Sequence, residues 1–143
     1  MRPDPSLFKL WHPVHVRFKD VDIGGHVHHS NVLVYFEEAR AEYWRRVVGK
    51  DDMEAVDFIM GEARVRYHGR ILYPSRLQVG ARVSLLGKKH FVMEYLARDE
   101  EGRDLASGET TMVMFDYQAR RTKAIDPQVR TAVEGHEGEF LGG

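Results

Sequence analysis

The chain has 143 residues, a length typical of one domain with a substantial hydrophobic core. Its hydrophobic content of 43% and charged content of 30% are those of an ordinary globular protein. The formal net charge of -1 argues against a general nucleic-acid-binding protein. The absence of cysteine excludes thiol catalysis, disulfides and thiolate metal sites.

The chain shows no sign of a membrane or secretory segment. Residues 1–12 lack the apolar run of a signal peptide, and no apolar stretch approaches the ~18 residues of a transmembrane helix. We therefore expect a soluble, cytoplasmic protein without membrane or nucleic-acid partners. Residues 1–143 should form a single domain, with an irregular arm at 1–12 and a short helix and frayed tail at 126–143.

Residues 14–49 combine a strand, a polar loop and a long helix. Val14, Val16 and Phe18 alternate with polar residues, which predicts a strand with one buried face. Helical spacing then places apolar residues on one face, at Val32, Tyr35, Phe36, Ala39, Tyr43 and Val47. Ser30 and Asn31 are the expected N-cap residues of this helix. Gly49 is the expected left-handed residue after its end.

The rest of the chain predicts strands that alternate over 56–67, 77–85, 91–97 and 105–117. A change of face at Gly61 indicates a β-bulge. Short turns between the strands favour a mainly antiparallel sheet. Asp126 and Pro127 are typical of the start of a short last helix. One long helix cannot cover both faces of five long strands, so we expect a second subunit to cover part of the other face.

The loop between the first strand and the long helix holds the most promising chemistry. It carries Asp20, Asp22, Gly24, Gly25, His26, His28 and His29. Polar, titratable residues beside a helix N-terminus predict a catalytic or binding site. The three histidines and either aspartate are also metal-ligand types, but no companion motif accompanies them, so we expect no metal. Asp20 could raise the pKa of Asp22, but we expect it to be a solvated loop charge.

Two segments, RFKDVDIGGHVHHSNVLVYFEEAR and LYPSRLQVGARV, resemble the signature of hotdog-fold acyl-CoA thioesterases of the 4-hydroxybenzoyl-CoA thioesterase family. The matching residues are Phe18, Asp20, Asp22, Gly25, Val27, His29, Asn31, Tyr35, Phe36, Glu37, Ala39 and Arg40. The resemblance implies an α+β hotdog fold, in which a five-stranded, mainly antiparallel sheet wraps a long central helix. It also implies a homodimer with the site at its interface, and two such dimers forming a homotetramer.

The resemblance further implies a catalytic role for Asp22, as nucleophile or as general base on water, and the residues leave both open. It implies that the backbone N–H of His29 stabilises the oxyanion, because helix N-terminal N–H groups lack intrahelical partners. The His29 side chain either orients water or the thioester, or makes an ordinary hydrogen bond. The substrate implied is an acyl-CoA, hydrolysed without cofactor.

The sequence departs from this signature at Val32 and His28, where the family usually has aromatic residues. Both positions lie near the entrance for the acyl group, so we expect His28 and Val32 to contact substrate. We expect the same of Gly25 and Asn31, although the main role of Asn31 should be to cap the helix. Glu37 is a weaker catalytic candidate that could pair with Arg40. Basic residues that could bind the CoA phosphates are Arg64, Arg66, Arg70, Lys88, Lys89, Arg120, Arg121 and Lys123.

Three alternatives remain open at this point. The chain could be an acyl-carrier-protein thioesterase, a hotdog dehydratase acting on a 3-hydroxyacyl thioester, or a non-catalytic module that binds acyl thioesters. The sequence does not indicate the length or type of the acyl chain.

Overall fold

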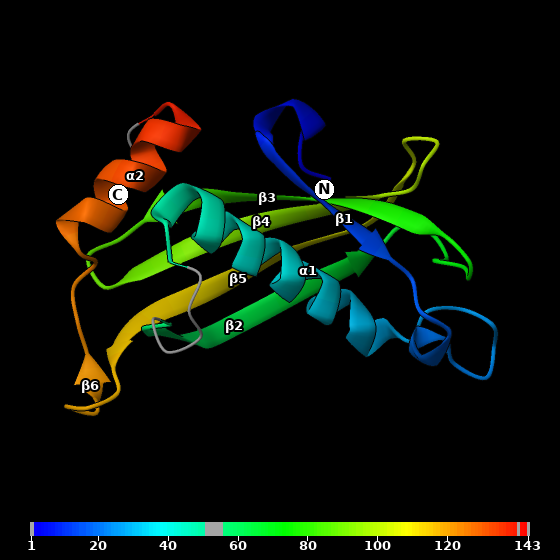
Figure 1. The fold of residues 1–143 in the computed structure, drawn as a ribbon, viewed down its shortest axis with the longest axis horizontal. Coiled ribbons are helices and arrows are strands. Elements are labelled where there is room, and N and C mark those ends of the chain that lie inside the picture. The colour runs from blue at the N-terminus through cyan, green and yellow to red at the C-terminus, as the bar shows by residue number, and fades with distance from the viewer. Residues whose placement is uncertain (1, 51–55, 140, 143) are drawn as a thin grey trace.

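The computed structural model describes residues 2–50, 56–139 and 141–142. A curled antiparallel sheet has the strand order β1-β3-β4-β5-β2, and a short sixth strand, β6, pairs with β5. The strands are β1 (Leu10–His15), β2 (Phe58–Tyr67), β3 (Arg76–Leu86), β4 (His90–Arg98), β5 (Asp104–Asp116) and β6 (Arg121–Thr122). The long helix α1 (His29–Tyr43) lies diagonally across one face of the sheet (Figure 1). This arrangement is the expected α+β hotdog fold.

The buried face of α1 follows the predicted helical spacing. Its apolar residues Val32, Tyr35, Phe36, Ala39 and Tyr43 are each at most 1% exposed. Phe36 stacks on Tyr95 of β4, with the ring centroids 4.7 Å apart. The helix continues as a π-helical turn, Trp44–Val48, and ends at Gly49, whose φ of 84° confirms the predicted left-handed residue. Among the described residues, no helix is long and apolar enough to cross a membrane.

The predicted strand pattern is confirmed over most of the sheet. β3 and β4 form the expected hairpin, with Ala81 opposite Tyr95. The register of β2 against β5 shifts between Met60 and Glu62, which confirms the bulge predicted at Gly61. The last helix, α2 (Pro127–Glu137), begins with proline after Asp126, as predicted, although the Asp126 side chain makes no capping hydrogen bond.

The predicted boundaries of the first strand are wrong at both ends. β1 begins at Leu10, inside the segment expected to be an irregular arm, because Leu10 pairs with Ala81 of β3. It ends at His15 rather than continuing to Phe18, which lies in a 3-10 turn (Phe18–Asp20) with its side chain 77% exposed. The Asp20 backbone N–H donates to the Arg17 carbonyl and closes this turn, so the alternation ends before Phe18.

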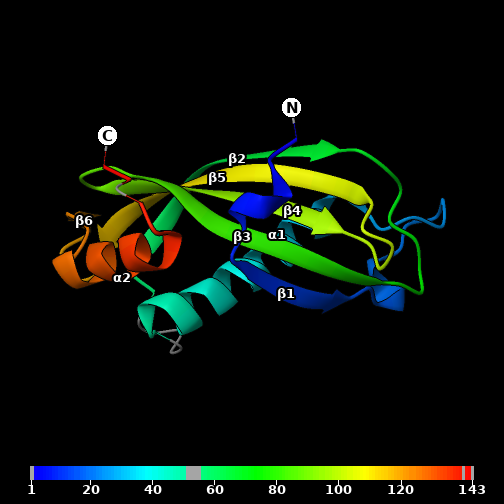
Figure 2. The ribbon, with the colours of Figure 1, turned by 90° about the horizontal axis from the view of Figure 1, so that it is seen from above.

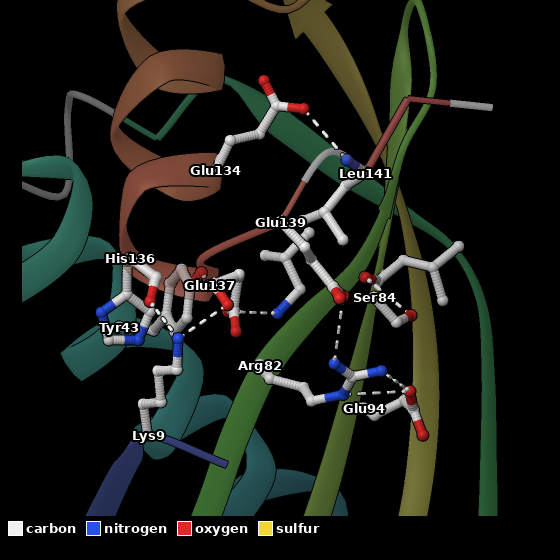
Figure 3. Close-up of polar contacts among 12 residues, drawn as sticks. Lys9, Tyr43, Arg82, Ser84, Glu94, Glu134, His136, Glu137, Glu139 and Leu141 are labelled. Atoms are coloured by element: carbon white, nitrogen blue, oxygen red, sulfur yellow. Dashed lines mark hydrogen bonds and ion pairs between the residues drawn. The ribbon is translucent and has the colours of Figure 1, made fainter. Parts of the chain in front are cut away.

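Two parts of the C-terminal segment, α2 and Leu141, are held by hydrogen bonds to the rest of the chain. The buried Glu137 carboxylate accepts hydrogen bonds from the Tyr43 hydroxyl at 2.6 Å and from the Val83 backbone N–H at 3.0 Å (Figure 3). The Leu141 carbonyl accepts from the Leu86 backbone N–H, and the Leu141 side chain is buried. These contacts tie α2 and Leu141 to α1 and β3.

The sheet face opposite α1 is partly covered by the chain itself. The N-terminal 3-10 turn (Pro5–Leu7) crosses over β3 (Figure 2). Phe8 and Trp11 lie so close to Gly80 that a Cβ there would meet the Phe8 ring at 3.0 Å and the Trp11 ring at 3.1 Å. Gly80 therefore allows the N-terminal segment to pack on β3. The far edge of β2 remains exposed, and no described strand pairs with it.

Candidate functional site

The loop between β1 and α1 folds back on itself at one end of the sheet (Figure 1). At its base, the Asp20 carbonyl accepts a hydrogen bond from the His28 backbone N–H at 2.8 Å. Val21 and Val27 form an antiparallel bridge, and the Asp22 backbone N–H donates to the His26 carbonyl at 2.7 Å. This small closed loop presents Asp22 near its tip and leads directly into α1.

The Asp22 carboxylate is held by one of its two oxygens. Its Oδ1 accepts hydrogen bonds from the backbone N–H groups of Gly24 at 2.8 Å and His26 at 3.3 Å. No described residue donates a hydrogen bond to the other oxygen, Oδ2. Gly25 closes the turn by donating to the Asp22 carbonyl, with a φ of 83° that favours glycine. The loop thus fixes the orientation of Asp22 while leaving one oxygen available.

The helix begins earlier than predicted, and Ser30 and Asn31 are not its N-cap. His28 is the N-cap, because its Nδ1 accepts the Ser30 backbone N–H at 3.2 Å. His29 is therefore the first helical residue, and its backbone N–H has no acceptor within the described part of the chain. The His29 ring stacks on His28, with centroids 4.2 Å apart. An unpaired N–H at the positive end of a helix dipole suits a developing negative charge.

Asp20 is a buried ionised group, not the solvated loop charge that we predicted. It is 2% exposed, and its Oδ2 accepts hydrogen bonds from the Tyr35 hydroxyl at 2.6 Å and from the Arg17 backbone N–H at 3.1 Å. The Arg17 guanidinium lies 3.3 Å from the same oxygen. Burial raises the pKa of Asp20, but the hydrogen bonds from Tyr35 and Arg17 outweigh it, so the pKa lies below its ordinary value.

The four residues expected to contact substrate lie in different environments. His28 and Gly25 are exposed on the loop. Asn31 is half-buried, and its Nδ2 donates to the Asp20 carbonyl at 3.1 Å, so it braces the loop from the helix. Val32 belongs to the hydrophobic core and is 1% exposed. Substrate contact by any of the four remains a prediction. The Val32 side chain is buried, so it lies beneath the molecular surface.

Two further sequence predictions concern Glu37 and the histidines. Glu37 pairs with Arg40 at 3.6 Å as expected, with its side chain 71% exposed. Within the described residues, no three His, Asp or Glu side chains are grouped closely enough to hold a metal ion.

Arg17, Tyr35 and Tyr67 also contribute contacts to this site, which we did not predict from the sequence. Tyr35 was predicted as a core residue and as a match to the family signature, but its hydroxyl also donates to Asp20. Tyr67 comes from β2, and its hydroxyl donates to the His29 carbonyl at 2.8 Å. The residues next to each tyrosine in the sequence do not indicate these hydrogen bonds, because each partner lies far away along the chain. The close spacing of Arg17 and Asp20 was a signal that the sequence did offer.

Comparison with known proteins agrees with this fold. Residues 16–133 match the thioesterase-like superfamily, so the chain belongs to that family. The acyl-CoA thioester hydrolase YbgC of Escherichia coli O157:H7 is 24% identical over 127 residues, which cover 87% of this chain and 93% of YbgC.

Solved structures show the same similarity. A thioesterase from Thermus thermophilus, complexed with coenzyme A and Zn, is 30% identical with a TM-score of 0.84, and the match covers 92% of this chain and 96% of that one. The DHNA-CoA thioesterase of Staphylococcus aureus, 23% identical, has the same fold with a TM-score of 0.79, over 92% of this chain and 96% of its own.

Proposed function

We propose that this protein is an acyl-CoA thioesterase that hydrolyses its substrate to a free acid and coenzyme A. The observation that carries the proposal is that one loop presents both the Asp22 carboxylate and, at its junction with α1, the His29 backbone N–H. One carboxylate oxygen of Asp22 and the backbone N–H of His29, the first residue of the adjoining helix, have no hydrogen-bond partner among the described residues. Membership of the thioesterase-like superfamily, and relatives named as thioester hydrolases, support this assignment.

In the proposed reaction, the His29 N–H donates to the thioester oxygen as negative charge develops there. Asp22 Oδ2 then acts in one of two ways. As a general base, it takes a proton from water while the water oxygen attacks the acyl carbon. As a nucleophile, it bonds to the acyl carbon itself, and water hydrolyses the resulting anhydride. In both routes the carbon–sulfur bond breaks, the CoA thiolate takes up a proton, and the acid leaves. The exposed His29 ring is available to orient water.

A homodimer is the second part of the proposal. Tyr67, Met60 and Ile59 of β2 are 52%, 43% and 40% exposed, and the outer edge of β2 has no partner strand among the described residues. An exposed strand edge with unpaired backbone groups is a template for pairing with another chain. We propose that two copies pair through β2 in antiparallel fashion, with the active site near this interface, and that two dimers form a tetramer.

The dimer also bears on how the CoA phosphates are bound. Arg64 is already paired with Glu109 at 2.8 Å. Arg120 and Arg121 follow β5 at the end of the sheet opposite to the Asp22 loop, and Lys88 and Lys89 lie between β3 and β4 at that same end. Antiparallel pairing of β2 would bring that end of the partner subunit alongside the loop. The basic residues at that end of one subunit would then bind the CoA phosphates at the active site of the other subunit.

The direct test is thiol release from a panel of short-chain, long-chain and aromatic acyl-CoAs, with the free acid identified as the second product. We expect turnover of at least one substrate, and loss of nearly all of it in Asp22→Asn. Release of neither thiol nor acid from any of them would contradict the proposal. Formation of an unsaturated thioester without thiol would identify a dehydratase. If no acyl-CoA is hydrolysed, thiol release from acyl-carrier-protein thioesters assayed in parallel would identify the other class of thioesterase.

A further inference from the structure

A buried polar cluster lies under the base of the Asp22 loop. The Asp20 carboxylate accepts the Tyr35 hydroxyl at 2.6 Å, the Arg17 backbone N–H at 3.1 Å and the Arg17 Nε–H at 3.3 Å. Tyr35 is fully buried in α1, and Asp20 is 2% exposed. A buried carboxylate that loses such donors pays a large desolvation cost, so its position is strongly determined.

The backbone of Asp20 connects this cluster to both halves of the candidate site. Its carbonyl accepts the His28 N–H at 2.8 Å and the Asn31 Nδ2–H at 3.1 Å, which fixes the start of α1. Asp22 follows two residues later, directly after Val21, which forms the bridge to Val27. A shift of Asp20 would therefore change the position of the Asp22 carboxylate relative to the His29 N–H.

We propose that the Tyr35 hydroxyl is a positioning group for hydrolysis: it fixes Asp20, and through Asp20 it sets the geometry between Asp22 and the His29 N–H. Tyr35 itself touches no reacting atom, because its side chain is enclosed in the core. This inference rests on the proposed function, and it adds a residue from the middle of α1 to the machinery. A small misplacement of reacting groups is enough to slow a reaction strongly.

The same helix provides a matched control. Tyr43 is also fully buried, and its hydroxyl also donates to a buried carboxylate at 2.6 Å, that of Glu137 (Figure 3). Tyr43 is the last residue of α1, and that end of the helix lies next to α2 (Figure 1). Tyr35→Phe and Tyr43→Phe therefore remove the same kind of hydrogen bond, one beneath the loop and one remote from it.

The experiment compares kcat, KM and Tm of the two variants and the wild type on the best acyl-CoA, at a temperature where all are folded. We expect both substitutions to lower Tm. We expect Tyr35→Phe to lower kcat by about tenfold or more with little change in KM, and Tyr43→Phe to keep kcat within about twofold of wild type. Equal kcat values in the two variants would overturn the proposal.

A second measurement separates this inference from the proposed function. Amide hydrogen exchange reports the loop directly, whether or not the wild type hydrolyses acyl-CoA. We expect the Asp22 and His28 backbone N–H groups, which are hydrogen-bonded inside the loop, to exchange faster in Tyr35→Phe than in Tyr43→Phe. Unchanged exchange at both groups in Tyr35→Phe would show that Asp20 holds the loop without Tyr35, and would refute the positioning role.

Discussion

Asp20 and Asp22 are two carboxylates in one loop with different surroundings. Asp20 is enclosed by Tyr35 and Arg17, whereas Asp22 is held by backbone N–H groups and keeps one oxygen available. The family resemblance predicted Asp22 as the reactive member of the pair. It could not distinguish the environment of Asp20, because the donor that matters most, Tyr35, lies on the next element. The difference between their surroundings comes largely from the Tyr35 contact to Asp20 rather than from the Asp-x-Asp spacing.

The depressed pKa of Asp20 gives a prediction for stability against pH. A carboxyl with a lower pKa in the folded state stabilises the fold above its unfolded pKa of about 3.9, and this contribution is lost as pH falls through the folded value. We expect Asp20→Asn to lower the free energy of unfolding at about pH 7, and the difference from wild type to shrink toward about pH 3. Urea unfolding across this range measures it. A difference that stays constant with pH would mean that the charge of Asp20 contributes nothing.

At the scale of the element, α1 was the most predictable part of the chain. Its apolar face and its end at Gly49 follow from periodicity and from the left-handed preference of glycine. Its N-terminus was missed because a histidine, His28, caps it in place of the more usual Ser30 or Asn31. Its polar contacts with Asp20 and Glu137 were missed as well, because a helical pattern does not reveal partners at a distance in sequence.

The contact between α1 and α2 carries a prediction for stability. Tyr43→Phe leaves the buried Glu137 carboxylate with the Val83 N–H as its only described hydrogen-bond donor. Hydrogen bonds to charged groups contribute about 1.5–3 kcal/mol, so we expect the free energy of unfolding to fall by roughly that amount. Urea denaturation of the two proteins at neutral pH gives the value. A change below about 0.5 kcal/mol would show that α2 is held mainly by its apolar contacts.

At the scale of the whole molecule, the strand pattern and the single long helix were sufficient to predict the fold class. The pattern could not show how the chain covers the second sheet face, because that depends on Phe8 and Trp11 packing on Gly80. It also could not place Val32, expected at the substrate entrance, which the fold encloses in its core. The exposed edge of β2 is a surface that no described strand of this chain covers.

The proposed dimer is tested by charging that edge. We expect the wild type to have at least twice the 16.5 kDa mass of one chain, and Ile59→Lys/Met60→Lys to be a monomer with reduced activity. Leu7→Lys, a substitution at a similarly exposed side chain away from β2, should keep the wild-type mass. Light scattering coupled to size-exclusion chromatography measures all three. A monomeric wild type, or an unaffected double variant, would rule out assembly through β2.

The most direct test of the account compares Asp22→Asn with Asp99→Asn on the best acyl-CoA substrate. Asp99 is a matched control, because its Oδ1 also accepts backbone N–H groups two and four residues further on, in the turn between β4 and β5. We expect Asp22→Asn to lower kcat by at least about a hundredfold while remaining folded, and Asp99→Asn to hydrolyse at nearly the wild-type rate. Equal rates in the two variants would contradict the central claim that the Asp22 carboxylate performs the hydrolysis.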